Sequence, residues 1–237
     1  MSESLQRAAR LFFLDDADPG SPLVHRIWRT RSVPADAFIS VARAHWTLVV
    51  TCMRGETSVT LRGPETHASH VAIPQDAEFF GIHFSLGTFM PARPMGPLVD
   101  NAETLPQLSP RTFLFDGSRW EVPRFDNADV FVERLVRKGL LKHDPILDIL
   151  RDGRPRMSAR SAQRRMLRST GLTYGELRQI ERAHEAVALL DRGVPILDVV
   201  ERTGFSDQPH LTRSLKRFAD QTPGEILREK VAFIQDV

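Results

Sequence analysis

The sequence predicts an α+β fold with a β-rich first part and an all-helical second part. Apolar residues recur with a period of two between about Leu23 and Phe89, and the period becomes helical from about Asn127 onward. Pairs such as Gly63-Pro64 divide the first region into several short strands. A chain of 237 residues is long enough for two compact domains. We therefore expect a first domain over residues 1–140 and a second over residues 141–237.

The first domain is predicted to be an antiparallel sandwich or barrel. Trp46, Leu48, Val50 and Cys52 alternate with other residues, which indicates a strand with one buried face. Because Cys52 is the only cysteine and lies in an apolar run, we expect it to be a small buried side chain, and a disulfide within the chain is excluded. Residues 91–124 are rich in proline and have weak periodicity, so we expect irregular covering segments there.

Composition places the chain among ordinary globular proteins. It has 41% apolar and 26% charged residues, no run of eighteen apolar residues, and no signal peptide pattern at its start. These features predict a cytoplasmic protein without a membrane anchor. The net charge is only +2, but six arginines and no acidic residue lie between Arg154 and Arg168. Such a basic run is a candidate contact for phosphate groups.

The second domain reads as two pairs of short helices joined by a longer helix. Asp144-Pro145 predicts a helix start, Ser158 and Gly171 bound the next helix, and a connecting helix is expected over Tyr174–Leu190. A further short helix over Ile196–Thr203 ends at Gly204, and either Ser206 or Asp207 begins the last helix of the second pair. Each pair is a helix-turn-helix pattern.

Specific motif residues identify the second pair. The segment from Gly193 to Pro223 contains Gly204-Phe205-Ser206-Asp207-Gln208 at the turn, followed by His210, Arg213, Lys216-Arg217 and Thr222-Pro223. This segment strongly resembles the signature of the AraC/XylS family of bacterial transcription regulators. The stretch Ser158–Gly171 resembles the first recognition helix of that family, although the connection Asp152–Met157 before it is longer and more basic than is usual. The resemblance implies an N-terminal domain that is often a cupin-like barrel, and RNA polymerase as a partner.

A helix fits the major groove and reads base edges with the exposed residues near its N-terminus. The positions that project away from the apolar faces, supported by the resemblance, predict a base-facing set made of Arg160, Gln163, Arg164, Gln208, His210 and Arg213. Residues further along the two helices are expected to meet phosphates, namely Arg168, Lys216 and Arg217. Two alternatives stay open: Arg165 pairs with Asp148 or Asp152, and His210 forms a hydrogen bond at the helix start.

Two reading helices on one chain predict a bipartite binding site. The connecting helix would span roughly 25 Å at 1.5 Å per residue. This length is compatible with two reading helices in successive major-groove segments about 34 Å apart. We therefore expect double-stranded DNA as a partner even for a monomer.

The first domain is expected to bind a small-molecule effector or to form a homodimer. This expectation is an analogy at the level of the fold. His45, His67, His70 and His83 invite a metal-site interpretation, but no HxH or HxxxE array accompanies them, so surface or core histidines are favoured and no cofactor is predicted. An aromatic group could line a pocket but is more typical of a core, namely Trp46, Phe79, Phe80, Phe84 and Phe89. The alternative to a regulator is a metal-dependent cupin-type enzyme with an accessory helical domain. No nucleophilic side chain with a neighbouring general base supports this alternative.

Overall fold

The computed structural model describes residues 12–17, 20–32, 37–72, 74–151 and 157–229. The strands of the first domain are β1 (Phe12–Ala17), β2 (Val24–Ser32), β3 (Ala37–Ser40), β4 (Thr47–Met53), β5 (Glu56–Arg62), β6 (Ser69–Ala72), β7 (Ala77–Phe84), β8 (Thr88–Phe89), β9 (Ala102–Thr104), β10 (Gln107–Ser109), β11 (Thr112–Phe115) and β12 (Ser118–Glu121). They are accompanied by the short turns η1 (Gly96–Leu98) and η2 (Phe125–Asn127), helix α2 (Ala128–Arg137) and strand β13 (Lys142–His143). The helices that follow are α3 (Ile146–Arg151), α4 (Ala159–Thr170), α5 (Tyr174–Asp191), α6 (Ile196–Thr203), α7 (Gln208–Ala219) and α8 (Pro223–Glu229).

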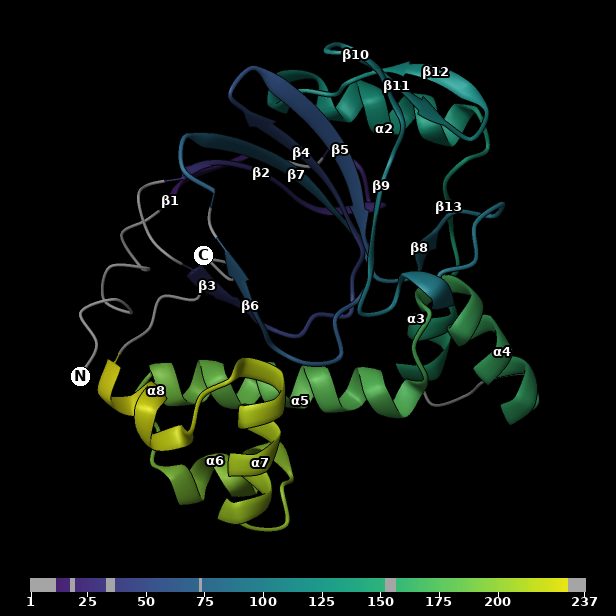
Figure 1. The fold of residues 1–237 in the computed structure, drawn as a ribbon. Coiled ribbons are helices and arrows are strands. Elements are labelled where there is room, and N and C mark those ends of the chain that lie inside the picture. The colour runs from purple at the N-terminus through teal and green to yellow at the C-terminus, as the bar shows by residue number, and fades with distance from the viewer. Residues whose placement is uncertain (1–11, 18–19, 33–36, 73, 152–156, 230–237) are drawn as a thin grey trace.

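A six-stranded antiparallel sheet forms the centre of the first domain. Its strand order is β1-β2-β7-β4-β5-β9, and a separate pair, β3 and β6, lies between this sheet and α5 (Figure 1). Val50 pairs with Phe80 and Leu48 pairs with Ile82, so these four buried side chains share one face of the sheet. Helix α2 and strands β11 and β12 cover that face and complete the first hydrophobic core. The antiparallel β-rich first part and the all-helical second part confirm the predicted fold class.

Two predictions for the first domain are wrong. Residues 91–124 are not simply irregular, because β10, β11 and β12 form a sheet there whose Phe113 and Trp120 are buried in the core. Strands of three or four residues offer too few alternations for the pattern to be read from sequence. Cys52 is exposed rather than buried, because it lies near the end of β4, where it lines a cleft instead of packing in the core.

The second hydrophobic core joins the helices to part of the first domain. It contains Met166 of α4, Ile180 of α5 and Leu211 of α7, together with Val41, Ala42 and Ala44 from the segment after β3. Leu141 belongs to the first core and Ile146 to the second. The division of the chain at residues 140 and 141 stays a prediction. Among the described helices, none has the length and apolar character needed to cross a lipid bilayer.

Candidate nucleic-acid interface

Helix α3 begins, and helix α4 begins and ends, where the sequence predicts. The amide of Ile146 donates to Asp144 Oδ1 at 3.0 Å, and the amide of Ser161 donates to Ser158 Oγ at 3.2 Å. Helix α4 ends at Gly171, whose φ of 77° lies in the left-handed region that glycine adopts without strain. The connection between the two helices cannot be compared with its prediction, because residues 152–156 lie outside the described ranges.

The second pair, α6 and α7, is bounded by the residues of the motif. Gly204 ends α6 with φ 69°, and Asp207 caps α7 by accepting the amide of His210 at 2.7 Å. This hydrogen bond also lowers the pKa of the Asp207 carboxyl. Of the two predicted caps, Asp207 rather than Ser206 therefore begins the helix. Leu211 and Leu215 are fully buried, which fixes the opposite face of α7 toward solvent.

Helix α5 connects the two pairs. Its 18 residues span about 27 Å at the usual helical rise. Thr173 and Glu176 form a reciprocal capping box at its start, in which each side chain accepts the backbone amide of the other residue. Figure 1 shows α4 beyond one end of α5, and α6, α7 and α8 beside its other part.

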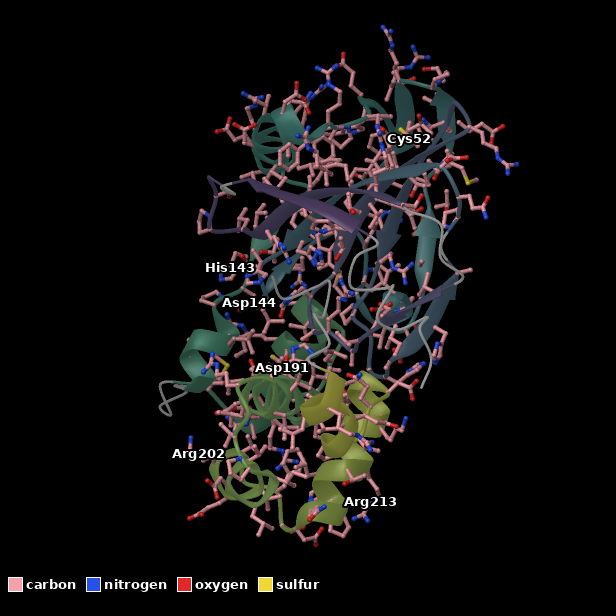
Figure 2. The ribbon with its side chains drawn as sticks, turned by 90° about the vertical axis from the view of Figure 1, so that its left-hand side faces the viewer. Cys52, His143, Asp144, Asp191, Arg202 and Arg213 are labelled. Atoms are coloured by element: carbon pink, nitrogen blue, oxygen red, sulfur yellow. The ribbon has the colours of Figure 1, made fainter. Side chains whose placement is uncertain are left out.

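Five of the six residues predicted to face bases are exposed and available. Their side chains make no hydrogen bond or ion pair to the part of the chain that the structure describes; they are Arg160, Gln163, Arg164, Gln208 and Arg213. Figure 2 shows Arg213 at the end of the molecule opposite Cys52. Guanidinium and amide groups of this kind can form paired hydrogen bonds with guanine and adenine. Their contact with bases stays a prediction.

His210 is held by its neighbours. Its Nδ1 lies 3.0 Å from Ser206 Oγ, and its ring meets the Phe205 ring edge to face at 5.1 Å between centroids. The alternative hydrogen bond at the helix start is therefore formed in this structure. The Nε2 atom of His210 has no hydrogen-bond partner among the described residues, so the predicted base contact remains a proposal for that atom.

The residues predicted to meet phosphates all have contacts within the protein. Arg168 lies with Cζ 5.4 Å from the centre of the Phe89 ring, and Arg217 lies 4.9 Å from the Phe218 ring. Lys216 Nζ donates to the carbonyl of Asp220 at 2.8 Å. The three cations lie in the C-terminal halves of α4 and α7.

Arg165 pairs with a carboxylate that the sequence interpretation did not choose. Its Nε donates to Asp144 Oδ2 at 3.1 Å, and its Nη2 contacts Oδ1 of the same group. The bond with Asp144 raises the pKa of Arg165. Asp152 and the side chain of Asp148 lie outside the described part of the structure. Asp144 was recognisable only as a helix cap, since its proximity to α4 depends on how α3 and α4 pack.

The first domain contacts the C-terminal ends of both recognition helices, which the sequence did not reveal. The amides of Ala42 and Ala68 donate to the carbonyls of Phe218 and Arg217, each at 2.8 Å. His70 Nε2 lies 2.9 Å from Asp220 Oδ2. Contacts between backbones that are more than 140 residues apart leave no pattern in a single sequence.

The four histidines considered in the sequence do not form one cluster. His45 and His83 lie near each other with ring centres 6.2 Å apart, whereas His67 contacts Asp100 and His70 contacts Asp220. Burial and nearby positive groups lower the pKa of His45 to about 3. In the described part of the chain, no three histidine, cysteine or acidic side chains are placed to hold a metal ion.

The first domain also contains a cleft. Its volume is about 1260 Å³, and it lies between the large sheet and residues 110–112 and 121–127. Phe79 and Phe80 line it together with Phe125, over whose ring the guanidinium of Arg29 lies at 4.6 Å. Of the aromatic group considered in the sequence, Trp46, Phe84 and Phe89 are core residues instead.

Comparisons with known proteins agree on the C-terminal region. Residues 154–229 match the family described as "Helix-turn-helix domain". The chain is 37% identical over 67 residues to the HTH-type transcriptional regulator RipA of Corynebacterium glutamicum, and this match covers 28% of the chain and 20% of that relative. The chain thus spans about a fifth of the length of this relative. A structure of ToxT from Vibrio cholerae aligns with 92% of this chain and 98% of its own, at 10% identity and a TM-score of 0.39.

Proposed function

Because the C-terminal domain is a helix-turn-helix domain of the AraC family, we propose that the protein is a transcription regulator that recognises a specific double-stranded DNA sequence. The observation that carries the proposal is the pair of helices α4 and α7, each of which presents exposed arginine and glutamine side chains without partners in the described structure. The AraC family is one of regulators and not of enzymes. The alternative of a cupin-type enzyme therefore has no support.

Recognition would combine two kinds of contact. Arg160, Gln163 and Arg164 of α4 would read one major-groove segment, and Gln208, His210 and Arg213 of α7 the next. Phosphate contacts from Arg168, Lys216 and Arg217 would fix the register without reading sequence. A bipartite site in successive turns of the duplex follows from this arrangement.

The full chain is suited to a direct test. Duplexes bound at near-physiological salt would be selected from a random DNA pool and sequenced, because non-specific affinity dominates at low salt. We expect two short conserved blocks about one helical turn apart. Selection that returns no enriched sequence would contradict the proposed function.

We further propose that the first domain receives a small organic effector or joins two copies of the chain, and that RNA polymerase is a partner of the DNA-bound protein. Support for an effector comes from the cleft, whose lining combines aromatic side chains with both arginines and carboxylates and therefore suits a molecule with an apolar body and polar groups. Cys52 lines the cleft and is exposed, so alkylation of its thiol reports occupancy. Aromatic carboxylates that slow this alkylation and raise the melting temperature would support the effector. A homodimer without any such protection would favour a domain that only dimerises.

A further inference from the structure

The C-terminal end of α7 is capped by the first domain. A helix leaves the carbonyls of its last turn without partners inside the helix. In α7, the carbonyls of Arg217 and Phe218 accept the amides of Ala68 and Ala42 at 2.8 Å. The cap residue Asp220 adopts a left-handed φ of 54° and contacts His70 through its carboxylate. Two backbone donors and one side chain of the first domain thus hold the end of a recognition helix.

The two donors are themselves held in place. Arg43 and Glu65 form a backbone bridge, with hydrogen bonds of 2.9 and 2.8 Å, between the segment that carries Ala42 and the segment that carries Ala68. The Glu65 carboxylate is buried, accepts the Ser40 hydroxyl at 2.9 Å, and pairs with Arg43. A buried carboxylate with several donors restrains the segments around it. The cap on α7 is therefore part of a rigid surface.

The same surface also contacts the connecting helix. His184 of α5 donates from Nε2 to the carbonyl of Ala42 at 2.6 Å, and Ala42 is completely buried in the second core. Ala42 thereby bonds α7 through its amide and α5 through its carbonyl.

The C-terminal end of α4 rests on another part of the first domain. A side chain built at Gly171 would approach the carbonyl oxygen of Met95 to 3.0 Å and Cγ2 of Val99 to 2.8 Å. Arg168 lies over the ring of Phe89 in β8. Meanwhile the exposed residues near the starts of α4 and α7 remain free of the first domain.

We infer that the first domain is a brace that sets the relative position of the two recognition helices for DNA binding. It holds both helices by their C-terminal ends and leaves both reading surfaces uncovered. This inference rests on the proposed function. If the brace is loosened, each helix can still read its own bases, but the distance between them is then held only by α5 and by the packing of the helices on one another. The property that changes is the dependence of affinity on the spacing of the two half-sites.

The test uses the full chain and the duplex that it selects. His70→Ala removes the side chain that contacts Asp220, and His67→Ala is its matched control, because His67 is similarly exposed but contacts Asp100 of the first domain. We expect His70→Ala to weaken binding to the selected duplex by about two- to fivefold, because the lost contact is largely exposed to solvent. The affinity of His70→Ala for single half-sites should be unchanged. The loss of affinity when the two half-sites are moved apart by one or two base pairs should be smaller than in the wild type. His67→Ala should behave like the wild type.

A second variant keeps the inference testable if His70→Ala folds poorly. Asp220→Gly tolerates the left-handed backbone, removes the carboxylate that contacts His70, and retains the backbone carbonyl that accepts Lys216 Nζ. It should relax the spacing dependence in the same way, and the double variant should add little to either single one. If both variants keep the wild-type spacing dependence while the wild type selects a bipartite site, the brace is contradicted but the proposed function is not. If the wild type selects no sequence, the proposed function itself fails.

Discussion

At the scale of single residues, the arginines of the recognition helices differ in whether their side chains make contacts within the protein. Arg213 is exposed and forms no hydrogen bond or ion pair with the described residues, whereas Arg217 lies over the neighbouring Phe218 ring. A guanidinium without internal contacts loses little when it binds a base edge. One that lies along its own helix suits the less directional contact with phosphate.

This difference leads to a prediction about discrimination. Arg213→Ala should cost about 1–3 kcal/mol at one base position and relax specificity there, whereas Arg217→Ala should weaken all sequences alike and reduce the salt slope by about one. Binding to the selected duplex and to single-base variants, measured over a range of salt concentrations, checks both. Equal losses on every sequence for Arg213→Ala would contradict its assignment to a base.

The residue scale also shows where sequence reasoning is limited. The helix caps Ser158 and Asp207 were predictable because each bonds an amide three residues away. The exposure of Cys52 and the pairing of Arg165 with Asp144 were not, because both depend on which distant segment covers a given face. Hydrogen bonds between neighbouring residues can be predicted from the local sequence. Which distant segment packs over a side chain cannot.

At the scale of elements, the helices were predicted closely and the short strands were not. Helix α5 was expected over Tyr174–Leu190 and extends to Asp191, since its apolar stripe repeats over many turns. Strands β10 to β12 have three or four residues each, and Phe113 of β11 and Trp120 of β12 are buried because they pack against Phe131 of α2. Periodicity is informative only where an element is long enough to repeat it.

The two glycines that end α4 and α6 provide a prediction at this scale. Both have positive φ, but a side chain at Gly204 meets nothing within 4 Å, whereas one at Gly171 would press on Met95 and Val99. Gly204→Ala should lower the free energy of unfolding by about 1 kcal/mol from backbone strain alone. Gly171→Ala should cost about 2–4 kcal/mol, because overpacking adds to the same strain.

Urea denaturation of the two full-length variants measures the difference. Gly204→Ala is the matched control, because it introduces the same backbone strain without a clash against Met95 or Val99. Similar losses for both variants would mean that α4 does not rest on η1 in solution.

At the scale of the whole molecule, the second core is shared between the two domains. Val41, Ala42 and Ala44 come from the first domain but pack with the helices. The sequence shows that these residues are small and apolar, and nothing in it assigns them to the distant helices. The arrangement of domains was therefore the least predictable part, even though the class of each domain was clear.

The shared core lies close to His45, which is half-buried, and to His83, which is buried, and these two histidines give the whole molecule a pH dependence. Burial, with His25, Arg43 and His184 nearby, lowers the pKa of His45 to about 3 from an ordinary value of 6.5. Burial lowers the pKa of His83 as well, and that side chain is 8% exposed. Nδ1 of His45 is buried without a hydrogen-bond partner among the described residues. Both rings are neutral in the folded protein at pH 7.

The sign of the effect follows from proton binding. Between pH 6.5 and about 3, the unfolded chain binds a proton at residue 45 that the folded chain does not, so stability falls as the pH is lowered through this range. Each such histidine contributes up to about 1.4 kcal/mol per pH unit.

Urea unfolding at pH 7.5, 6 and 5 should show this loss of stability. His45→Gln, which cannot be protonated, should reduce the slope, and the exposed control His67→Gln should leave it unchanged. A slope that His45→Gln does not alter would place the His45 ring in water rather than in the interior.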